Sequence, residues 1–521
     1  MDSRQYLKLI RDTFDETLDE FDTSYEKREF DDVFTDLIHS LLETKDDDYD
    51  SIFNYLVKNY LKSVEAISKL SPGLSTGLYD EKGNIKINTY NGKMSDIPND
   101  DEIAEDTVFD ASSMTKMFTS VLLLKESERG NIDLNKKFSD YNPLLSKVDV
   151  KIIDALRFGV NLRTDGRLDE PNISKKIRVE RLKSTYVFER DTFIYSDIPY
   201  MLVPLLFGKT LEEATENYLN KFYELYKDEL GLSKTGYSLI NMTGGTVNLD
   251  LINDIYSKDG LFDPKANMFE KQVGYISGHA GVTTTVKDLE KLFKSLSHGL
   301  LSVSSLKELI TAAHDTDILL DKNGNEVIRN GKKVYINRGM GVYLNKGNIR
   351  ISDMPSRFSP SSFASAGSTG TYCIYDISNG LNMIYLSNAR SGLYSKWINT
   401  GDYTYGDNND QIQKNYGTTL ISGTGSMKDG SIIRENGTAM TYTRATNNFK
   451  EEGLRTLLKL RIAKKVLVKK AKIELSDILL DEELSKIEEV FSGNNSKKIK
   501  LKRAWELSDC WQSKFVNSLL F

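Results

Sequence analysis

The stretch FDASSMTKMFTSVLLLKE, residues 109–126, is the most informative part of this 521-residue sequence. Its apolar residues recur at spacings of three and four, which predicts a helix with one apolar face: Met114, Met117, Phe118, Val121 and Leu122. Ser113 opens this helix, and Lys116 follows one turn later on the same side. Unpaired N–H groups at a helix start can stabilise an oxyanion, and a desolvated lysine can fall in pKa and serve as a base. The pair is therefore a candidate nucleophile and base.

This S-x-x-K spacing is weak evidence when it stands alone. A second match, Ser304 to Lys307, occurs in LSVSSLKELI, so chance supplies such spacings easily. Ser113 could equally be an ordinary helix N-cap, a position at which serine is common. The surrounding sequence has to decide between these alternatives.

Working outward from this helix, strands are predicted early and late, with helices between them. Residues 1–65 show helical periodicity, and a hairpin follows from residue 72. Helical patterns dominate residues 114–300. Later, TYCIYDI and LNMIYLS flank an Asn379-Gly380 pair, which favours a tight hairpin turn. This order predicts an α+β fold in which both ends of a domain build one antiparallel sheet around an inserted helical subdomain.

Two segments together carry a resemblance to a known family. DTVFDASSMTKMFTS, followed by RGNIDLNKKFSDYNP, resembles the serine β-lactamase, penicillin-binding protein and esterase superfamily, particularly its class C-like branch. The resemblance covers about residues 65–395. It implies an antiparallel sheet flanked by helices with an inserted all-helical subdomain, and it makes Ser113 the nucleophile of an acyl-enzyme mechanism with Lys116 beside it.

The second element of that family is Tyr-x-Asn, and this chain offers Tyr195-Ser196-Asp197 before an apolar stretch. Asp197 departs from the family pattern because a carboxylate accepts hydrogen bonds but cannot donate them as an amide does. If it is ionised beside Lys116, it should raise the pKa of the lysine and weaken it as a base. Tyr195 would then carry more of the proton transfer.

The third element is Lys-Thr-Gly or His-x-Gly on a strand. The literal Lys234-Thr235-Gly236 lies in a helical region, with no alternating strand predicted after it, so we reject it. FASAGSTGTYCIYDI precedes the Asn-Gly hairpin, which assigns the element to Ser365-Ala366-Gly367. Ser365 replaces a cationic or imidazole side chain, and Gly367 would allow substrate to approach the strand closely.

By resemblance, the backbone N–H groups of Ser113 and Ser368 would form the oxyanion hole. Because the third element lacks a cation, we expect an ester or amide without a critical carboxylate to be favoured over a β-lactam, although Arg390 could replace some of the lost charge. His279, in Gly-His-Ala-Gly, is assigned a structural role. No metal site or cofactor is expected, since the four His and two Cys show no ligand spacing.

The predicted organisation has four parts: an acidic helical extension (1–65), the hydrolase domain (66–395), a polar connector (396–440) and a basic, partly helical extension (441–521). Residues 1–60 carry 7 Lys/Arg against 17 Asp/Glu, and residues 441–521 carry 17 against 11. The two ends could therefore dock on each other, within one chain or between copies in a homo-oligomer. Acidic runs among the basic residues argue against nucleic-acid binding. The basic stretch 461–472 could contact an anionic membrane or pack on its own domain, and we favour packing.

The resulting hypothesis is a serine hydrolase that forms an acyl-enzyme on Ser113 with an ester or amide, including a D-amino-acid peptide. Lys116 and Tyr195 would move the proton. The alternative is a catalytically reduced relative that serves as a binding or assembly scaffold, supported by the departures at Asp197 and Ser365. A cytoplasmic location is expected because the sequence contains neither a signal peptide nor a membrane span, although a segment removed by processing would leave no trace.

Overall fold

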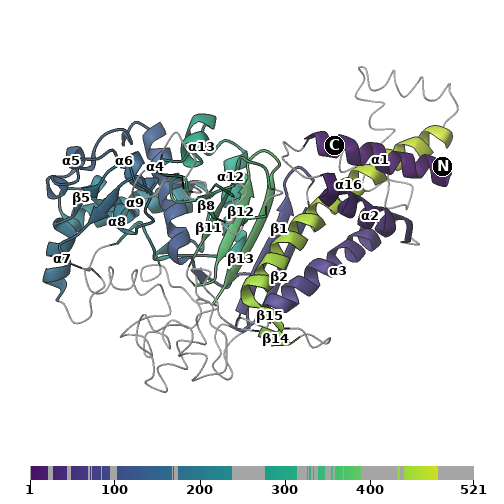
Figure 1. Cartoon of the computed structure of the whole chain (residues 1–521), viewed down its shortest axis with the longest axis horizontal. Coiled ribbons are helices and arrows are strands. Elements are labelled where there is room, and N and C mark those ends of the chain that lie inside the picture. Colours follow the sequence, from purple (N-terminus) through teal and green to yellow (C-terminus); the bar gives the residue numbers. More distant parts are fainter. Residues whose placement is uncertain are drawn as a thin grey trace. The chain divides into compact units, whose positions relative to one another are not determined.

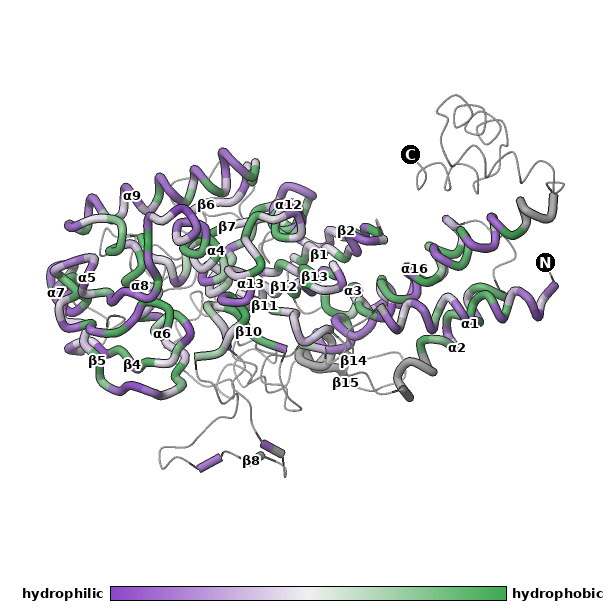
Figure 2. Tube along the Cα trace, turned by 90° about the horizontal axis from the view of Figure 1, so that it is seen from above, coloured by the Kyte–Doolittle hydropathy of each residue, from purple (hydrophilic) through white to green (hydrophobic). Residues whose placement is uncertain are grey.

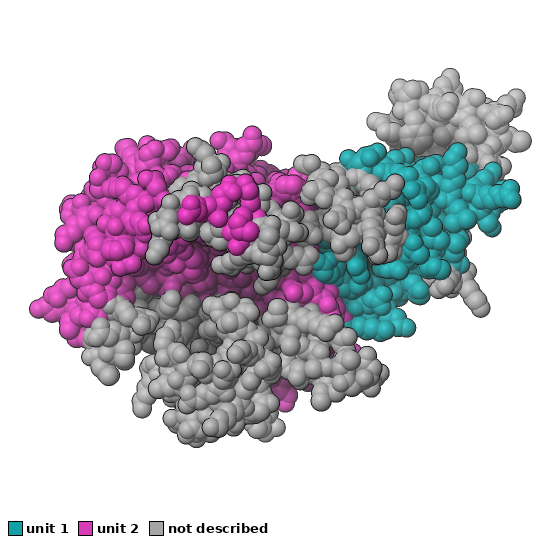
Figure 3. Space-filling model, viewed as in Figure 1, with its two compact units in different colours: residues 1–62, 80–85, 451–521 teal, residues 63–79, 86–450 magenta. Residues whose placement is uncertain are grey.

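A computed structural model describes most of the chain in two compact units, coloured separately in Figure 3. Unit 1 comprises residues 1–62, 80–85 and 451–521, and unit 2 comprises residues 63–79 and 86–450. The described residues within them are 2–20, 27–43, 49–68, 71, 73–83, 85–93, 102–166, 168, 174–237, 276–313, 325–326, 328–329, 332–333, 338–345, 354–355, 358–367, 369–388, 431–433 and 439–478.

A six-stranded antiparallel sheet is the largest sheet among these residues (Figure 1). Its spatial order is β10-β11-β12-β13-β1-β2. The strands are β1 (Gly73–Asp80), β2 (Ile85–Gly92), β10 (Tyr343–Leu344), β11 (Ser362–Ala366), β12 (Tyr372–Asp376) and β13 (Leu381–Ser387). Because β13 pairs with β1, strands from both ends of the domain meet in the middle of the sheet, which confirms the predicted layout.

The hairpin between β12 and β13 also forms as predicted. Gly380 has a φ of +66°, a backbone conformation that residues with a side chain rarely adopt. Asp376 holds the turn, since its Oδ1 accepts a hydrogen bond of 3.0 Å from the backbone N–H of Asn379. The pairing of Cys373 with Ile384 then sets the register. Local turn chemistry is therefore enough to specify this corner of the sheet.

The two faces of the sheet have different coverings within unit 2. On one face, Tyr375 of β12 stacks on Phe293 of α12 (Val286–Ser297), with ring centroids 5.2 Å apart. Tyr372 lies an odd number of positions away on the same strand and so faces the opposite side. There the ring of Tyr385 meets Phe449, near the start of α16 (Tyr442–Ile478), at 5.4 Å. Helices therefore flank both faces.

The region between the early and late strands is mostly helical, as predicted, although it also contains short strands. Its helices are α4 (Thr115–Glu128), α5 (Phe138–Tyr141), α6 (Ile152–Leu156), α7 (Lys175–Lys183), α8 (Ile198–Met201), α9 (Leu211–Tyr223) and α13 (Val303–Leu309), with the shorter turns η1 (Ser112–Met114), η2 (Pro143–Leu145), η3 (Val203–Leu206) and η4 (Glu224–Glu229). β4 (Asn161–Arg163) pairs with β5 (Tyr186–Glu189), and β3 (Phe109–Asp110), β7 (Val282–Thr284) and β6 (Gly236–Tyr237) form a small sheet in that order.

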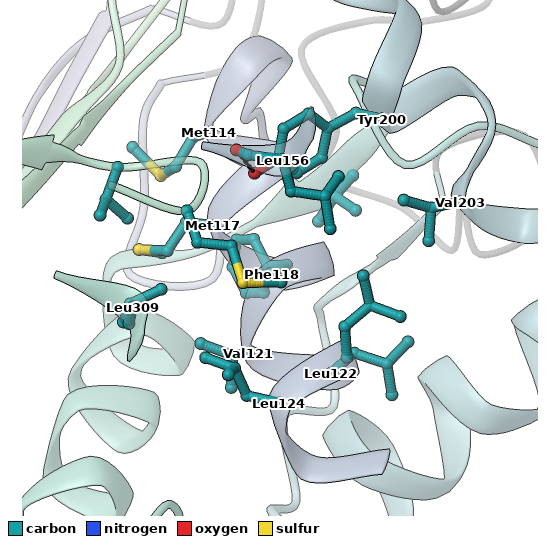
Figure 4. Close-up of a cluster of buried hydrophobic side chains, with 14 of the residues drawn as sticks. Met114, Met117, Phe118, Val121, Leu122, Leu124, Leu156, Tyr200, Val203 and Leu309 are labelled. Atoms are coloured by element: carbon teal, nitrogen blue, oxygen red, sulfur yellow. Dashed lines mark hydrogen bonds between the residues drawn. The ribbon is translucent and has the colours of Figure 1, made fainter. Parts of the chain in front are cut away.

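Helix α4 lies at the centre of the core of unit 2. We expected one apolar face, but 11 of its 14 residues are buried, among them Lys116. Figure 4 shows that α4 is surrounded by side chains from several elements, including Leu156 of α6, Tyr200 of α8 and Leu309 of α13. A helix covered on nearly all sides is held rigidly, so its first turn is a firm support for a reactive group.

Unit 1 is built from α1 (Ser3–Glu20), α2 (Lys27–Glu43), most of α3 (Tyr49–Ser68) and most of α16. Polar and apolar residues alternate along α16 (Figure 2). Val466 and Leu467 are buried, so the apolar side of the basic stretch 461–472 packs within the unit. Lys459 of α16 forms an ion pair of 3.0 Å with Asp36 of α2, and Lys469 pairs with Glu16 of α1. Acidic and basic ends thus meet within one unit.

The remaining described strands are short. β8 (Ile328–Arg329) pairs with β9 (Lys332–Lys333), and β14 (Ser431–Ile433) pairs with β15 (Ala439–Thr441). The predicted connector at 396–440 lies outside the described residues except for β14 and the start of β15. Among the described helices, none combines the length and the apolar character that crossing a membrane requires.

Candidate active site

Ser113 lies in a short turn that is fixed by contacts with two strands. The turn η1 connects β3 to α4, and Ser112 within it has a φ of +48°, which is unfavourable for a residue other than glycine. Asp110 supports this conformation, since its Oδ1 accepts a hydrogen bond of 2.7 Å from the N–H of Ser112. Thr369 donates to the carbonyl of Asp110 at 2.8 Å. The backbone is therefore strained and held in place immediately before the candidate nucleophile.

Lys116 has acceptors for all three of its ammonium hydrogens. Its Nζ lies 3.2 Å from Oγ of Ser113, 2.8 Å from Oδ1 of Asp197 and 3.0 Å from the carbonyl oxygen of His279. The side chain is only 1% exposed. An ammonium group has three donors and no lone pair, so this arrangement fits the charged form of the lysine.

The pKa of Lys116 is raised above its ordinary value. Burial acts to lower it and is the largest single influence, but the charge of Asp197, the electrostatic interaction with Tyr195, and the hydrogen bonds to Asp197 and Tyr195 together outweigh burial. The expectation that Lys116 has a lowered pKa is therefore wrong for this chain, because its partners outweigh burial. The other expectation, that an ionised Asp197 raises the pKa of Lys116, agrees with the direction of the shift.

Tyr195 completes the group around Ser113. Its Oη donates a hydrogen bond of 3.1 Å to Oγ of Ser113. The ring packs against Phe158 at 5.1 Å between centroids, and the ammonium of Lys116 lies 5.2 Å from the ring centre. Because Tyr195 is 43% exposed, the phenol is both fixed by neighbours and open to solvent. The three residues predicted from the sequence thus meet at one point.

The third predicted element occupies the end of β11 and the residue after it, next to the turn that carries Ser113. Ser365 is buried and pairs with Cys373 in the sheet. Gly367 has no room for a side chain, since a Cβ there would lie 2.3 Å from the carbonyl oxygen of Ala111 and 3.1 Å from Cβ of Ser112. The sequence suggested that the missing side chain at Gly367 makes room for substrate. In the structure, the close neighbour at this position is instead the backbone of the chain itself. Ser368 and Arg390 lie outside the described residues.

The competing motif matches occupy structural positions. Thr235, from the rejected Lys-Thr-Gly, is buried and donates to Oδ2 of Asp288 at 2.9 Å. Gly236 begins β6, so a two-residue strand follows where none was predicted. Ser304 is exposed within α13. Within the described part of the chain, none of these residues hydrogen-bonds to Ser113.

Two contributions to the site could not be found from the sequence. The first is the carbonyl of His279, a backbone group, which binds Lys116 while the buried imidazole contacts Ser277 at 2.5 Å. The second is Arg338, whose guanidinium lies 4.6 Å from the ring centre of Tyr195 and 3.3 Å from that of Tyr343. The only local feature of the sequence around Arg338 is the turn-forming Arg-Gly-Met-Gly run. This run gives no indication that the side chain contacts Tyr195, which is distant in the sequence.

The donor set around Ser113 suits acyl transfer. A hydroxyl with two flanking proton donors and acceptors is the arrangement that nucleophilic catalysis requires. Among the described residues, no group of three or more His, Cys, Asp or Glu side chains is placed to hold a metal ion.

Comparison with known proteins places the chain in a family. The Beta-lactamase family model matches residues 68–395, and the chain belongs to this family of serine hydrolases. A protein of Escherichia coli K12 named "Putative D-alanyl-D-alanine carboxypeptidase" is 22% identical over 319 residues, which span 54% of this chain and 69% of that protein.

Solved structures with low sequence identity also align with the chain. The D-amino acid amidase from Ochrobactrum anthropi SV3 is 16% identical, with a TM-score of 0.43, over 70% of this chain and 97% of its own. EstCE1, a hydrolase with promiscuous acyltransferase activity, is 15% identical, with a TM-score of 0.45, over 67% and 99%.

Proposed function

We propose that this protein is a serine hydrolase that forms an acyl-enzyme on Ser113 with an ester or amide substrate. One observation carries the proposal: Oγ of Ser113 accepts hydrogen bonds from both Lys116 and Tyr195, at 3.2 and 3.1 Å. Lys116, three positions away in the sequence, and Tyr195, 82 positions away, thus converge on the hydroxyl of Ser113. The buried lysine would have little reason to lie there in a purely structural turn.

The two neighbours of Ser113 have different parts in the proposed reaction. Lys116 is a charged donor and cannot accept a proton, whereas a phenol hydroxyl can donate or accept. Tyr195 therefore relays the proton: as Oγ attacks the carbonyl carbon and the bond to the leaving group breaks, the phenol oxygen takes the proton of Ser113 and releases its own proton to the leaving group, so the phenol is neutral before and after the step. The cation of Lys116 stabilises negative charge that develops on Oγ and on the phenol oxygen.

The second half of the reaction restores the enzyme. A water molecule loses a proton to Tyr195 and attacks the acyl carbon, and Ser113 regains its proton as the acid is released. The relative named as a D-alanyl-D-alanine carboxypeptidase makes D-amino-acid peptides reasonable test substrates beside simple esters. Both are ester or amide acyl donors.

Labelling by a fluorophosphonate probe tests the proposal. We expect the wild-type chain to be labelled on Ser113, and the Ser113→Ala variant to remain unlabelled while keeping its fold by circular dichroism. Ser304→Ala is the matched control, because it removes the serine of the other S-x-x-K match, and it should label normally. An unlabelled, correctly folded wild type would instead support a binding or assembly scaffold.

A further inference from the structure

Arg338 is a cation beside the ring of Tyr195 in the proposed active site. It precedes a tight turn in which Gly341 has a φ of +72° and the N–H of Gly339 donates to the carbonyl of Val342 at 3.0 Å. This turn brings Arg338 back beside Tyr343, with which it forms an isolated antiparallel bridge. The guanidinium is therefore placed by backbone geometry as well as by its ring contacts.

The guanidinium is held through its faces. Its Cζ lies 3.3 Å from the ring centre of Tyr343, 4.6 Å from that of Tyr195 and 5.8 Å from that of Phe158. Stacking occupies the plane faces of the group and leaves the N–H donors at its edge. Within the described part of the chain, Arg338 makes no ion pair and no side-chain hydrogen bond. Its donors are therefore pre-positioned for a planar anion.

The charge balance of the site favours the same conclusion. Lys116 is buried and its charge is compensated by Asp197 at 2.8 Å, so this pair offers a substrate no net charge. Ser365 contributes no charge to the third element. Arg338 is half-buried, and among the described residues it is the cation in contact with Tyr195 that has no ion-pair partner.

We infer that Arg338 binds a carboxylate of the acyl substrate, through the paired N–H···O contacts that guanidinium and carboxylate groups form. The inference rests on the proposed function for the identity of the site, and it names the class of substrate: esters or amides that carry a carboxylate. It also revises the expectation drawn from Ser365, because Arg338 supplies a cation from outside the third element.

Two matched pairs of esters test the inference. One pair carries the carboxylate on the acyl side: mono-p-nitrophenyl glutarate and its methyl ester. The other carries it on the leaving group: 4-acetoxybenzoate and its methyl ester. The ratio of kcat/KM for the anionic ester to that for its neutral partner is measured in the wild type, Arg338→Met and Arg338→Lys. Comparing ratios between variants cancels the intrinsic reactivity of each ester.

In Arg338→Met the ratio should fall by about 10- to 100-fold for at least one pair, because charged hydrogen bonds are lost. Arg338→Lys keeps a positive charge and should therefore retain part of the preference for the anionic ester. Arg163→Met is the control: it removes one positive charge that also stacks on a ring, Phe188 at 3.4 Å, and should leave the ratio unchanged. The inference is overturned if Arg338→Met lowers kcat/KM for the anionic and neutral esters by the same factor, or if it changes kcat/KM for neither ester.

A binding measurement separates this inference from the proposed function. Calorimetric titration of Ser113→Ala with 4-acetoxybenzoate and with mono-p-nitrophenyl glutarate does not depend on turnover. We expect the affinity for an anionic ester to be at least 10-fold weaker in Ser113→Ala/Arg338→Met than in Ser113→Ala, with the affinity for its methyl ester unchanged. This result would support carboxylate binding by Arg338 even if the wild type proves inactive. Equal affinity for both esters in both proteins would contradict the inference while leaving hydrolase activity unaffected.

Discussion

Asp197 places its Oδ1 2.8 Å from Nζ of Lys116, closer than either of the other two acceptors of the ammonium. The carboxylate and the hydroxyl of Ser113 thus share one cation. Because the lysine is buried, this contact has more influence on its charge state than it would have at the surface. The consequence is a division of roles between Lys116 and Tyr195 that mutations can test.

The first prediction concerns the phenol of Tyr195. Tyr195→Phe removes the hydroxyl but keeps the ring that packs on Phe158 and Arg338, so the fold should be preserved. We expect kcat/KM for p-nitrophenyl butyrate to fall by about 10²- to 10⁴-fold, the usual contribution of a proton-transfer group. Tyr186→Phe, a hydroxyl loss on β5, is the control and should be close to wild type. A loss below threefold in Tyr195→Phe would assign the proton transfer elsewhere.

The second prediction concerns Asp197→Asn. Burial lowers the pKa of Lys116 and Asp197 raises it, so removing the carboxylate charge should lower that pKa. Since the charged lysine is the active form, kcat/KM should begin its alkaline decline at a lower pH in the variant than in the wild type. Unfolding should be measured across the same pH range to separate loss of activity from loss of fold. A variant more active than wild type near neutral pH would show that Lys116 is the base.

The third prediction concerns Gly367→Ala. The new Cβ would approach the carbonyl oxygen of Ala111 and Oγ1 of Thr371 to 2.3 Å, so the turn that holds Ser113 must move. Overpacking of this kind costs about 1–3 kcal/mol. We expect a lower thermal midpoint and a fluorophosphonate labelling rate at least 10-fold slower, measured by gel fluorescence. Wild-type labelling with an unchanged midpoint would rule out this contact.

The fourth prediction concerns a buried ion pair in unit 1, Arg461 with Asp80 at 3.6 Å. Arg461→Met leaves a buried carboxylate without its cation, which should cost about 3 kcal/mol near neutral pH. Asp80→Asn/Arg461→Met removes both charges and should recover much of the loss. Chemical unfolding of the single and double variants provides the measurement, and an undiminished loss in the double variant would contradict the charge explanation.

This loss should depend on pH in a defined direction. Burial raises the pKa of Asp80, with Arg461 and backbone N–H groups opposing the rise, so Arg461→Met should raise it further. A carboxyl that holds its proton more tightly when folded becomes less costly as the pH falls and the proton binds. The stability difference between wild type and variant should therefore be smaller at about pH 4 than at about pH 7. A difference that grows on acidification would refute this sign.

Elements with local causes were predictable. The Asn379-Gly380 hairpin follows from a positive φ at Gly380, and the early helices follow from apolar spacing. The burial of α4 on nearly all sides was not predictable, because polar residues such as Thr119 are buried through hydrogen bonds to distant groups. Periodicity indicates which residues are apolar, whereas burial also depends on which partners arrive from elsewhere.

The sequence by itself determined the candidate nucleophile, the neighbouring lysine and the tyrosine, because Ser113, Lys116 and Tyr195 belong to short motifs whose spacing is local. Only the tertiary structure decided the charge state of Lys116 and the presence of Arg338 beside Tyr195. Both depend on distances between segments far apart in the chain, and electrostatic interactions follow distance in space and burial, which residue order does not encode. The same physical reason accounts for the carbonyl of His279, a group that every residue carries and that only folding places.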